Sequence, residues 1–243
     1  MCGRYLIEDE AYADILQILH DLNAAQDRIN MDNISGIGNL ASDVAGLGEV
    51  GLGEFMRGEV FPTNVAPVVQ LDGALAVKWG FPHWKNSSVI INARAETALE
   101  KKMFGKPLRE RRCIVPSSGF YEWGRIGSLA GNMSLFDNGD LPDSGMHSRN
   151  GGSKKKDKFL LRRPEGNVLY MAGMMSTFRD ALGEPYDAFV ILTTSANESV
   201  APIHDRMPVI LAQDEAASWV KDKTFMEFAL HRPGPELSAL KVS

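Results

Sequence analysis

The 243-residue sequence has only two cysteines and no apolar run long enough to cross a membrane. So few cysteines exclude a disulfide framework and fit a reducing compartment. The cysteines and five scattered histidines give no paired zinc-ligand spacing, so we expect neither a metal nor another cofactor. Acidic residues occupy positions 8–10, where an export signal would have its apolar stretch. We therefore expect a cytoplasmic protein that makes no membrane contact.

Positive charge is scarce overall but locally concentrated. The net charge is −5, which by itself does not indicate nucleic-acid binding. Residues 85–112 nevertheless hold eight Lys or Arg against three Asp or Glu, and residues 149–163 hold seven against one. A basic groove on an acidic body can bind a phosphate backbone locally. An isolated charge run is more often a solvated face, so the two interpretations stay open.

The length and the ordinary composition, 44% hydrophobic and 23% charged, predict one domain over residues 1–243. A glycine-rich excursion over 32–58 lacks the G-x-x-x-x-G-K-[ST] pattern of a phosphate-binding loop. A second aperiodic stretch, 124–157, is typical of a flexible insertion within a hairpin. We expect a monomer.

Short β-like runs dominate the remaining chain, and few helical patterns interrupt them. Helices are expected over 9–25, 95–102 and 213–220, with a helical turn at 198–203. Strands are expected over 60–71, 74–81, 89–91, 113–116, 119–123, 158–163, 168–175, 188–193 and 207–211. Because strands and helices do not alternate one for one, a doubly wound fold is disfavoured. The pattern predicts an α+β fold, a mostly antiparallel, barrel-like sheet with a few flanking helices.

The N-terminal segment MCGRY offers a specific chemistry. Removal of Met1 would leave Cys2 with a free α-amine beside its thiol. Such an aminothiol condenses with an aldehyde to an imine, and the sulfur then closes a thiazolidine ring. The amine has a pKa of about 7.7–8.0, so part of it is neutral at pH 7. The thiolate is the reactive form of sulfur, and the Arg4 cation would raise its fraction.

Two motifs combine aromatic, amide and cationic side chains. Residues 79–84 (WGFPHW) form an aromatic ridge that could stack on bases, although core packing is the competing interpretation for each tryptophan. Residues 92–97 (NARAET) follow an apolar run. Asn92 can orient a reacting group and Arg94 offers a planar fork for phosphate. A helix-capping asparagine beside a surface arginine would give the same pattern.

Two further motifs supply groups that can transfer protons. Glu122, between Tyr121 and Trp123 in a predicted strand, would be partly desolvated and suited to general acid–base catalysis. Strand alternation could instead turn it to solvent. His204, in HDRMP, can hold or relay a proton near neutral pH. An ordinary ion-pair turn is the alternative for that segment.

Together the motifs resemble one known family. The segments MCGRY, WGFPHW, NARAET, RRCIVPSSGFYEW and HDRMPVIL, in this order, resemble the SRAP family, the SOS response-associated peptidases that process abasic sites in DNA. The resemblance runs from residue 1 to about 211. It implies that Cys2 forms a thiazolidine with the aldehyde of an abasic site, after self-removal of Met1. It also implies that Asn92 positions the adduct, that Glu122 acts as acid and base, and that His204 assists proton transfer.

The same resemblance implies a DNA partner, namely single strands with abasic sites, near junctions with a duplex. The implied DNA-binding residues are Arg4, Asn64, Pro67, Trp79, Pro82 and Arg94. Arg4 and Arg94 would contact phosphates, Trp79 and Pro82 would shape the surface where a duplex ends, and the protein would associate with the nucleoid when bound to DNA. One departure is AGMM at 172–175, where the family has a tryptophan.

Two other functions are compatible with parts of the sequence. Met-Cys-Gly also begins glutamine amidotransferases, which use an N-terminal cysteine to hydrolyse an amide. The GFYEW and HDRMP motifs belong with SRAP instead. A non-covalent module for single-stranded DNA could use the aromatic ridge and the basic stretches, and its binding would be reversible and strongly salt-dependent.

Overall fold

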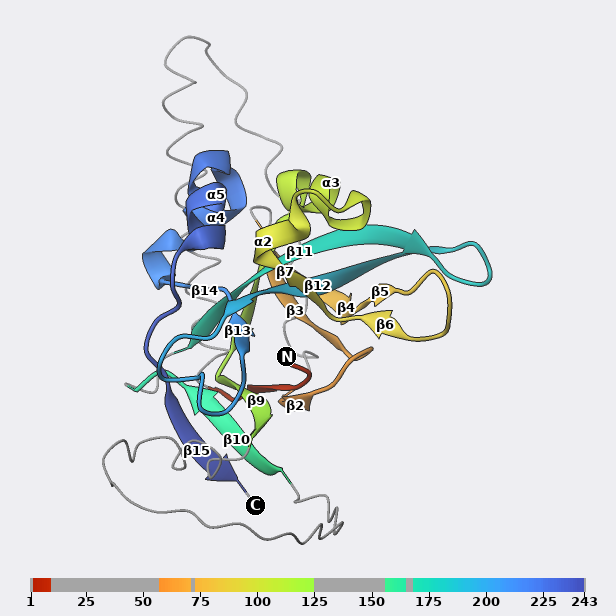
Figure 1. Cartoon of the computed structure of the whole chain (residues 1–243). Coiled ribbons are helices and arrows are strands. Elements are labelled where there is room, and N and C mark those ends of the chain that lie inside the picture. Colours follow the sequence, from red (N-terminus) through yellow and green to blue (C-terminus); the bar gives the residue numbers. More distant parts are fainter. Residues whose placement is uncertain (1, 10–56, 71–72, 125–155, 165–167, 243) are drawn as a thin grey trace, which may run out of the picture.

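The computed structural model describes residues 2–9, 57–70, 73–124, 156–164 and 168–242, and strands make up most of them. Two main sheets form the body of the molecule (Figure 1). The smaller sheet has the order β15-β10-β9-β1-β2, and all its pairings are antiparallel. Its strands are β1 (Tyr5–Ile7), β2 (Gly58–Val60), β9 (Gly119–Gly124), β10 (Asp157–Arg162) and β15 (Ser238–Val242).

The larger sheet closes on itself. Its path runs β13-β12-β4-β3-β8-β11-β14, and an additional pairing of β12 with β11 completes a ring of five strands. Its strands are β3 (Val65–Gln70), β4 (Gly73–Trp79), β7 (Asn92–Arg94), β8 (Arg112–Ser117), β11 (Leu169–Arg179), β12 (Pro185–Ser195), β13 (Arg206–Pro208) and β14 (Ile210–Leu211). Only β4 and β7 pair in parallel, both with β12. The predicted barrel-like, mostly antiparallel α+β fold is confirmed.

A few helices cover one side of the barrel (Figure 1). They are α2 (Ala95–Ala98), α3 (Lys102–Glu110), the 3₁₀ turn η2 (Gln213–Glu215), α4 (Ala216–Lys221) and α5 (Lys223–His231). The α5 helix begins where the carboxylate of Asp222 accepts hydrogen bonds from the backbone N–H groups of Thr224 and Phe225. A short hairpin, β5 (Phe81–Pro82) with β6 (Val89–Ile90), stands apart from both sheets.

A buried arginine joins two of these helices to the barrel. Arg112 is 3% exposed and has its guanidinium among main-chain carbonyls. It donates to Leu108 and Arg109 in the last turn of α3, and to Trp219 and Val220 in the last turn of α4. A cation at two helix C-termini satisfies carbonyls that have no partner within their own helix.

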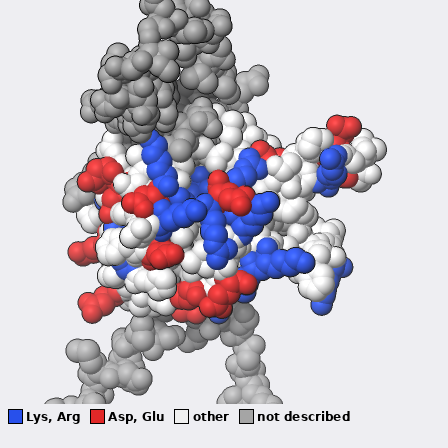
Figure 2. Space-filling model, turned by 90° about the horizontal axis from the view of Figure 1, so that it is seen from above, with Lys and Arg blue, Asp and Glu red and all other residues white. Residues whose placement is uncertain are grey.

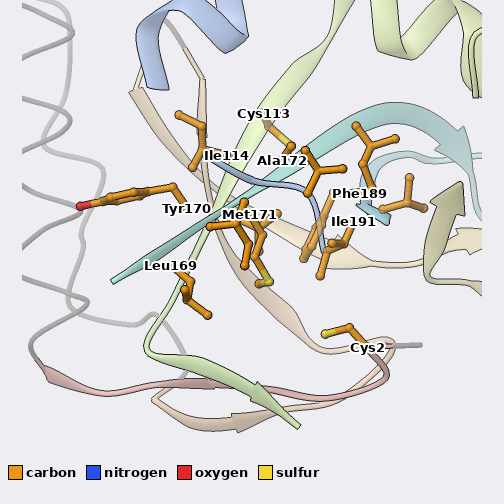
Figure 3. Packing of buried hydrophobic residues seen from close by; sticks show 14 of the residues in the cluster. Cys2, Cys113, Ile114, Leu169, Tyr170, Met171, Ala172, Phe189 and Ile191 are labelled. Carbon is orange, nitrogen blue, oxygen red and sulfur yellow. The ribbon is translucent and has the colours of Figure 1, made fainter. Parts of the chain in front are cut away.

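The core lies inside the barrel and between the two sheets. Figure 3 shows buried side chains of β8, β11 and β12, with Cys2 below them. Trp79 is wholly buried; its ring lies 5.0 Å from that of Tyr5 and 6.3 Å from that of Phe189. Its indole N–H donates to the carbonyl of Ile91, so the only polar atom of the side chain is satisfied.

Several element boundaries differ from the predicted ones. The helix expected over 95–102 ends at Ala98, and the separate helix α3 was not anticipated. The strand expected over 207–211 consists of β13 and β14, which pair with different neighbours. Strand β15 and helix α5 were also missed. Residues 10–25, 32–56 and 125–155, for which a helix and two excursions are expected, lie outside the described residues.

Candidate active site

The Cys2 side chain lies in the interior, immediately before β1. The residue is 0% exposed, and its thiol contacts the carbonyl oxygen of Arg4 at 3.7 Å. Burial, followed by the negative charge of Glu122, raises the pKa of the thiol far above its usual value. The sulfur is therefore a neutral thiol in this state, and its activation needs a proton acceptor.

The expectation that the Arg4 cation activates Cys2 is wrong. The Arg4 guanidinium pairs with Glu59 at 3.0 Å and stacks 4.3 Å from the ring centre of Phe61 and 5.1 Å from that of Trp123. Strand alternation explains this placement, because Tyr5 turns inward and Arg4 turns to the other face of the small sheet. Arg4 contacts Cys2 through its main-chain carbonyl oxygen, whereas its guanidinium binds Glu59.

Asn92 directly contacts the cysteine backbone. It begins β7, which lies parallel to β12 with Asn92 opposite Ile191. Its side-chain Nδ2 donates to the carbonyl oxygen of Cys2 at 2.9 Å. Its Oδ1 is buried and makes no hydrogen bond to any described residue. The amide therefore holds the cysteine from one side and keeps an acceptor available for a ligand.

Glu122 and His204 face each other across the same region. Glu122 lies on β9, is 3% exposed, and has its Oε2 3.9 Å from Nε2 of His204. The negative charge of Glu122 is the second cause, after burial, of the raised pKa of the Cys2 thiol. The alternative that strand alternation turns Glu122 to solvent is excluded by its burial.

Two neighbours compete for the second nitrogen of His204. Nδ1 lies 2.9 Å from a carboxylate oxygen of Asp205, and it also accepts from the backbone N–H of Arg206 at 3.0 Å. A neutral ring nitrogen cannot both donate and accept. The backbone N–H always carries its proton, and Asp205 is 86% exposed, so we assign Nδ1 as the acceptor. The ring proton then lies on Nε2, toward Glu122.

Two of the expected DNA contacts are buried. Trp79 and Pro67 lie in the core, so neither side chain is itself exposed to a DNA strand. Trp79 belongs to β4 and Pro67 to β3, two neighbouring strands of the closed ring. Of the two tryptophans in residues 79–84, only Trp84 is on the surface, at 76% exposure.

The other expected contacts are at or near the surface. Arg94 is exposed beside Asn92, and Pro82 is half-buried on the β5–β6 hairpin. Asn64 is half-buried, and its Oδ1 accepts from the backbone N–H of Phe61, which closes a tight turn. Within that turn Thr63 has a φ of 75°.

A charged cluster near the N-terminal strand was not foreseen. Lys158 on β10 pairs with Glu59 at 2.5 Å, on the carboxylate that also holds Arg4. The hydrogen bond from Lys158 is the largest cause that lowers the pKa of Glu59. The ammonium group of Lys158 also lies 3.9 Å from the ring centre of Tyr121. Only the alternation of GFYEW on β9, which turns Tyr121 and Trp123 to one face, was visible in the sequence.

The basic stretch 85–112 is only partly near the cysteine. Lys102, Lys106 and Arg109 are exposed on α3, which lies on the side of β11 and β12 away from the N-terminus (Figure 1). Figure 2 shows basic side chains gathered on the face seen from above, with acidic ones among them. Within the described residues, no group of three or more His, Cys, Asp or Glu could hold a metal ion. None of the described helices is long and apolar enough to span a membrane.

The fold combines a closed, mostly antiparallel barrel with a buried cysteine, an amide bonded to its carbonyl, and a buried carboxylate that faces an imidazole. The chain belongs to the SOS response associated peptidase (SRAP) family, whose model matches residues 1–243. It is 33% identical over 184 residues to the abasic site processing protein YoaM of Bacillus subtilis, covering 70% of each chain. It is 30% identical over 149 residues to the abasic site processing protein YedK of Escherichia coli, covering 60% of this chain and 54% of that one.

Solved structures share the fold. A protein from Bacteroides thetaiotaomicron superposes with a TM-score of 0.59 at 25% identity, covering 76% of this chain and 78% of that chain. A protein from Bordetella bronchiseptica gives a TM-score of 0.57 at 22% identity, covering 78% of this chain and 89% of that chain.

Proposed function

We propose that this protein processes abasic sites in single-stranded DNA by cross-linking to them covalently through Cys2, once Met1 has been removed. The observation that carries the proposal is that Asn92 bonds the carbonyl of the buried Cys2, while Glu122, whose charge acts on the Cys2 thiol, faces His204. The names of the relatives, abasic site processing proteins, support the substrate. The DNA partner would place the protein at the nucleoid.

The proposed chemistry has two steps. The α-amine of Cys2 attacks the aldehyde of the ring-opened sugar and forms an imine, and water leaves. The sulfur then bonds to the imine carbon, its proton is transferred to the imine nitrogen, and a thiazolidine closes. Because burial holds the sulfur as a neutral thiol, this step requires a base, and the buried Glu122 carboxylate, whose charge acts on the thiol, would serve as that base. His204 would donate the proton that the departing hydroxyl of the first step needs.

The same groups would act on the precursor. We propose that hydrolysis of the Met1–Cys2 peptide bond, which consumes one water, is self-catalysed and releases the amine. The buried Oδ1 of Asn92, an acceptor without a partner among the described residues, would then hold the liberated amine. Arg94, exposed beside Asn92, would contact a phosphate next to the lesion.

The test is intact mass spectrometry and a denaturing gel after incubation with an oligonucleotide that contains one abasic site. We expect a mass increase equal to the DNA minus one water, and a band that survives denaturation. Cys2→Ala should abolish the product, whereas Cys113→Ala should retain it. Cys113 is the matched control, because it is also buried with a strongly raised thiol pKa. A normal product from Cys2→Ala would refute the proposal.

The mass of the purified protein before DNA is added tests the proposed self-removal of Met1. Wild-type protein should lack the mass of Met1, and Glu122→Gln should keep it if cleavage is self-catalysed. Loss of Met1 from Glu122→Gln would assign the cleavage to a separate aminopeptidase and leave the cross-link proposal intact. Glutamine hydrolysis by the purified protein, without any DNA product, would favour the amidotransferase alternative.

A non-covalent mode of DNA binding has one observation in its favour. Trp84 is 76% exposed and Phe61 40% exposed, and the cations Lys85 and Arg4 lie against their rings. Exposed aromatics with cations are typical of surfaces on which bases stack. Salt-sensitive binding of undamaged single strands, with no covalent band from abasic ones, would make this the sole function.

A further inference from the structure

An ion pair outside the reacting groups connects two of the elements that carry them. The Arg206 guanidinium donates to both carboxylate oxygens of Glu96, from Nη1 at 2.6 Å and from Nη2 at 2.8 Å. Nη2 also donates to the carbonyl oxygen of Thr193 at 2.5 Å. The Arg206 side chain is only 11% exposed. Bidentate, charge-assisted bonds of this kind fix both partners in direction as well as distance.

The pair crosses a strand of the barrel. Thr193 on β12 is opposite Arg94 of β7 and also opposite Pro208 of β13, because these two short strands pair with β12. Arg206 begins β13, whereas Glu96 lies in α2, directly after β7. The guanidinium therefore joins β13, β12 and α2, which are separated by long stretches of sequence.

Both ends of the pair lie close in the chain to a proposed reacting group. Glu96 follows Asn92 by four residues and shares its β7–α2 segment. Arg206 follows His204 by two residues, and its own backbone N–H donates to Nδ1 of the histidine. A displacement of Arg206 would therefore move the donor that orients the imidazole, and a displacement of Glu96 would move the segment that carries the amide.

We propose that the Glu96–Arg206 pair is a positioning latch that holds Asn92 and His204 in register around Cys2. This inference rests on the proposed cross-linking function. The latch sets the rate of the covalent step, not the affinity for DNA, because the Arg206 guanidinium is largely buried and already donates to a carboxylate and a carbonyl. Arg94, which is exposed, is the better phosphate contact of the two.

The charge state agrees with this role. The hydrogen bond from Arg206 is the largest cause that lowers the pKa of Glu96, so the carboxylate is ionised at neutral pH. Glu96→Gln keeps the size of the side chain and removes the charge. Arg206→Lys keeps the charge and removes the two-pronged geometry.

The experiment measures single-turnover cross-linking over a range of concentrations of abasic oligonucleotide. We expect both variants to lower the maximal rate by about tenfold to a hundredfold, as small misplacements of reacting groups do. The half-saturating DNA concentration should stay within about twofold of wild type. The double variant Glu96→Gln with Arg206→Lys should lose no more than either single variant, since each removes the same latch.

A matched ion pair provides the control. Arg111 binds Asp187 in the same two-pronged way, at 3.1 and 2.9 Å, on another part of β12. Asp187→Asn should therefore cost similar stability and leave the cross-linking rate unchanged. Thermal melting of all variants separates a loss of folded protein from a loss of positioning, and Arg206→Lys gives a second measurement if Glu96→Gln does not fold.

Three outcomes would overturn the latch. One is a wild-type maximal rate in a folded Glu96→Gln or Arg206→Lys variant. Another is a raised half-saturating concentration in Arg206→Lys alone, which would make Arg206 a DNA contact. The third is an equal loss of rate in Asp187→Asn, which would make the effect general. Absence of a product from the unmodified protein would instead remove the proposed function, and the latch with it.

Discussion

Replacement of Arg112 by methionine should destabilise the protein strongly, although the Arg112 side chain makes no hydrogen bond to a candidate site residue. The guanidinium donates to four helix-terminal carbonyls. The bonds to Leu108 and Trp219 are buried, whereas those to Arg109 and Val220 are part-buried, so water can replace the second two. Methionine fills similar space but donates nothing.

The expected loss in the free energy of unfolding follows from the two buried carbonyl groups. A buried acceptor left without a donor costs about 1–3 kcal/mol, so Arg112→Met should lower the free energy of unfolding by about 2–6 kcal/mol. Relief of the buried charge, whose pKa is lowered mainly by desolvation, moves the result toward the lower end.

Urea unfolding followed by circular dichroism measures this loss. The control is Arg109→Met, because the Arg109 guanidinium donates only in part-buried and exposed surroundings and should cost under about 1 kcal/mol. A loss below about 1 kcal/mol for Arg112→Met would refute the reasoning that these carbonyls depend on Arg112.

Three further predictions concern the backbone and one ion pair. Thr63→Gly should raise the melting temperature by relieving about 1 kcal/mol of strain at φ 75°, and a lower value would contradict this. Gly124→Ala places a Cβ 2.7 Å from the carbonyl oxygen of Ile203, beside the histidine loop, so cross-linking should slow about tenfold; an unchanged rate in folded protein would count against it. The hydrogen bond from Arg111 lowers the pKa of Asp187 in the folded protein. The ionised Asp187 therefore contributes stability above its unfolded pKa of about 3.9, and this contribution is lost as the pH falls through the lower pKa of the folded state. Acid denaturation should therefore be shallower in Asp187→Asn, and identical pH dependence would exclude the effect.

The motifs predicted the candidate site residues that lie in contact better than they predicted the surface around them. Asn92, Glu122 and His204 were predicted from motifs, and two of their contacts bring them to Cys2 or to each other. The burial of Glu122 could not be derived from its motif, because Glu122 alternates as a surface strand residue would. This burial depends on segments that are distant in the sequence, among them the one that carries His204, whose Nε2 lies 3.9 Å from the carboxylate.

The predictions that failed for Trp79 and for helix α3 did so because long-range packing overrides the local sequence pattern. Trp79 and Trp84 flank the same Gly-Phe-Pro-His segment, yet one is buried and the other exposed. The difference arises because β4 pairs with both β3 and β12, a closure that no local pattern records. Helix α3 was not predicted because Gly105 and Pro107 are unfavourable in a helix. Leu108 and other buried residues nevertheless pack the helix against the barrel, and this packing stabilises it.

The order of strands in the smaller sheet has a consequence for how the protein is made. Strand β1 is synthesised before the other described strands, yet it lies between β2 and β9, and β9 is in turn bordered by β10. Strand β1, which follows Cys2, therefore cannot pair with β9 until more than a hundred later residues have been synthesised. His204 emerges later still, so a nascent chain carries the Cys2 thiol long before the Glu122–His204 pair can form.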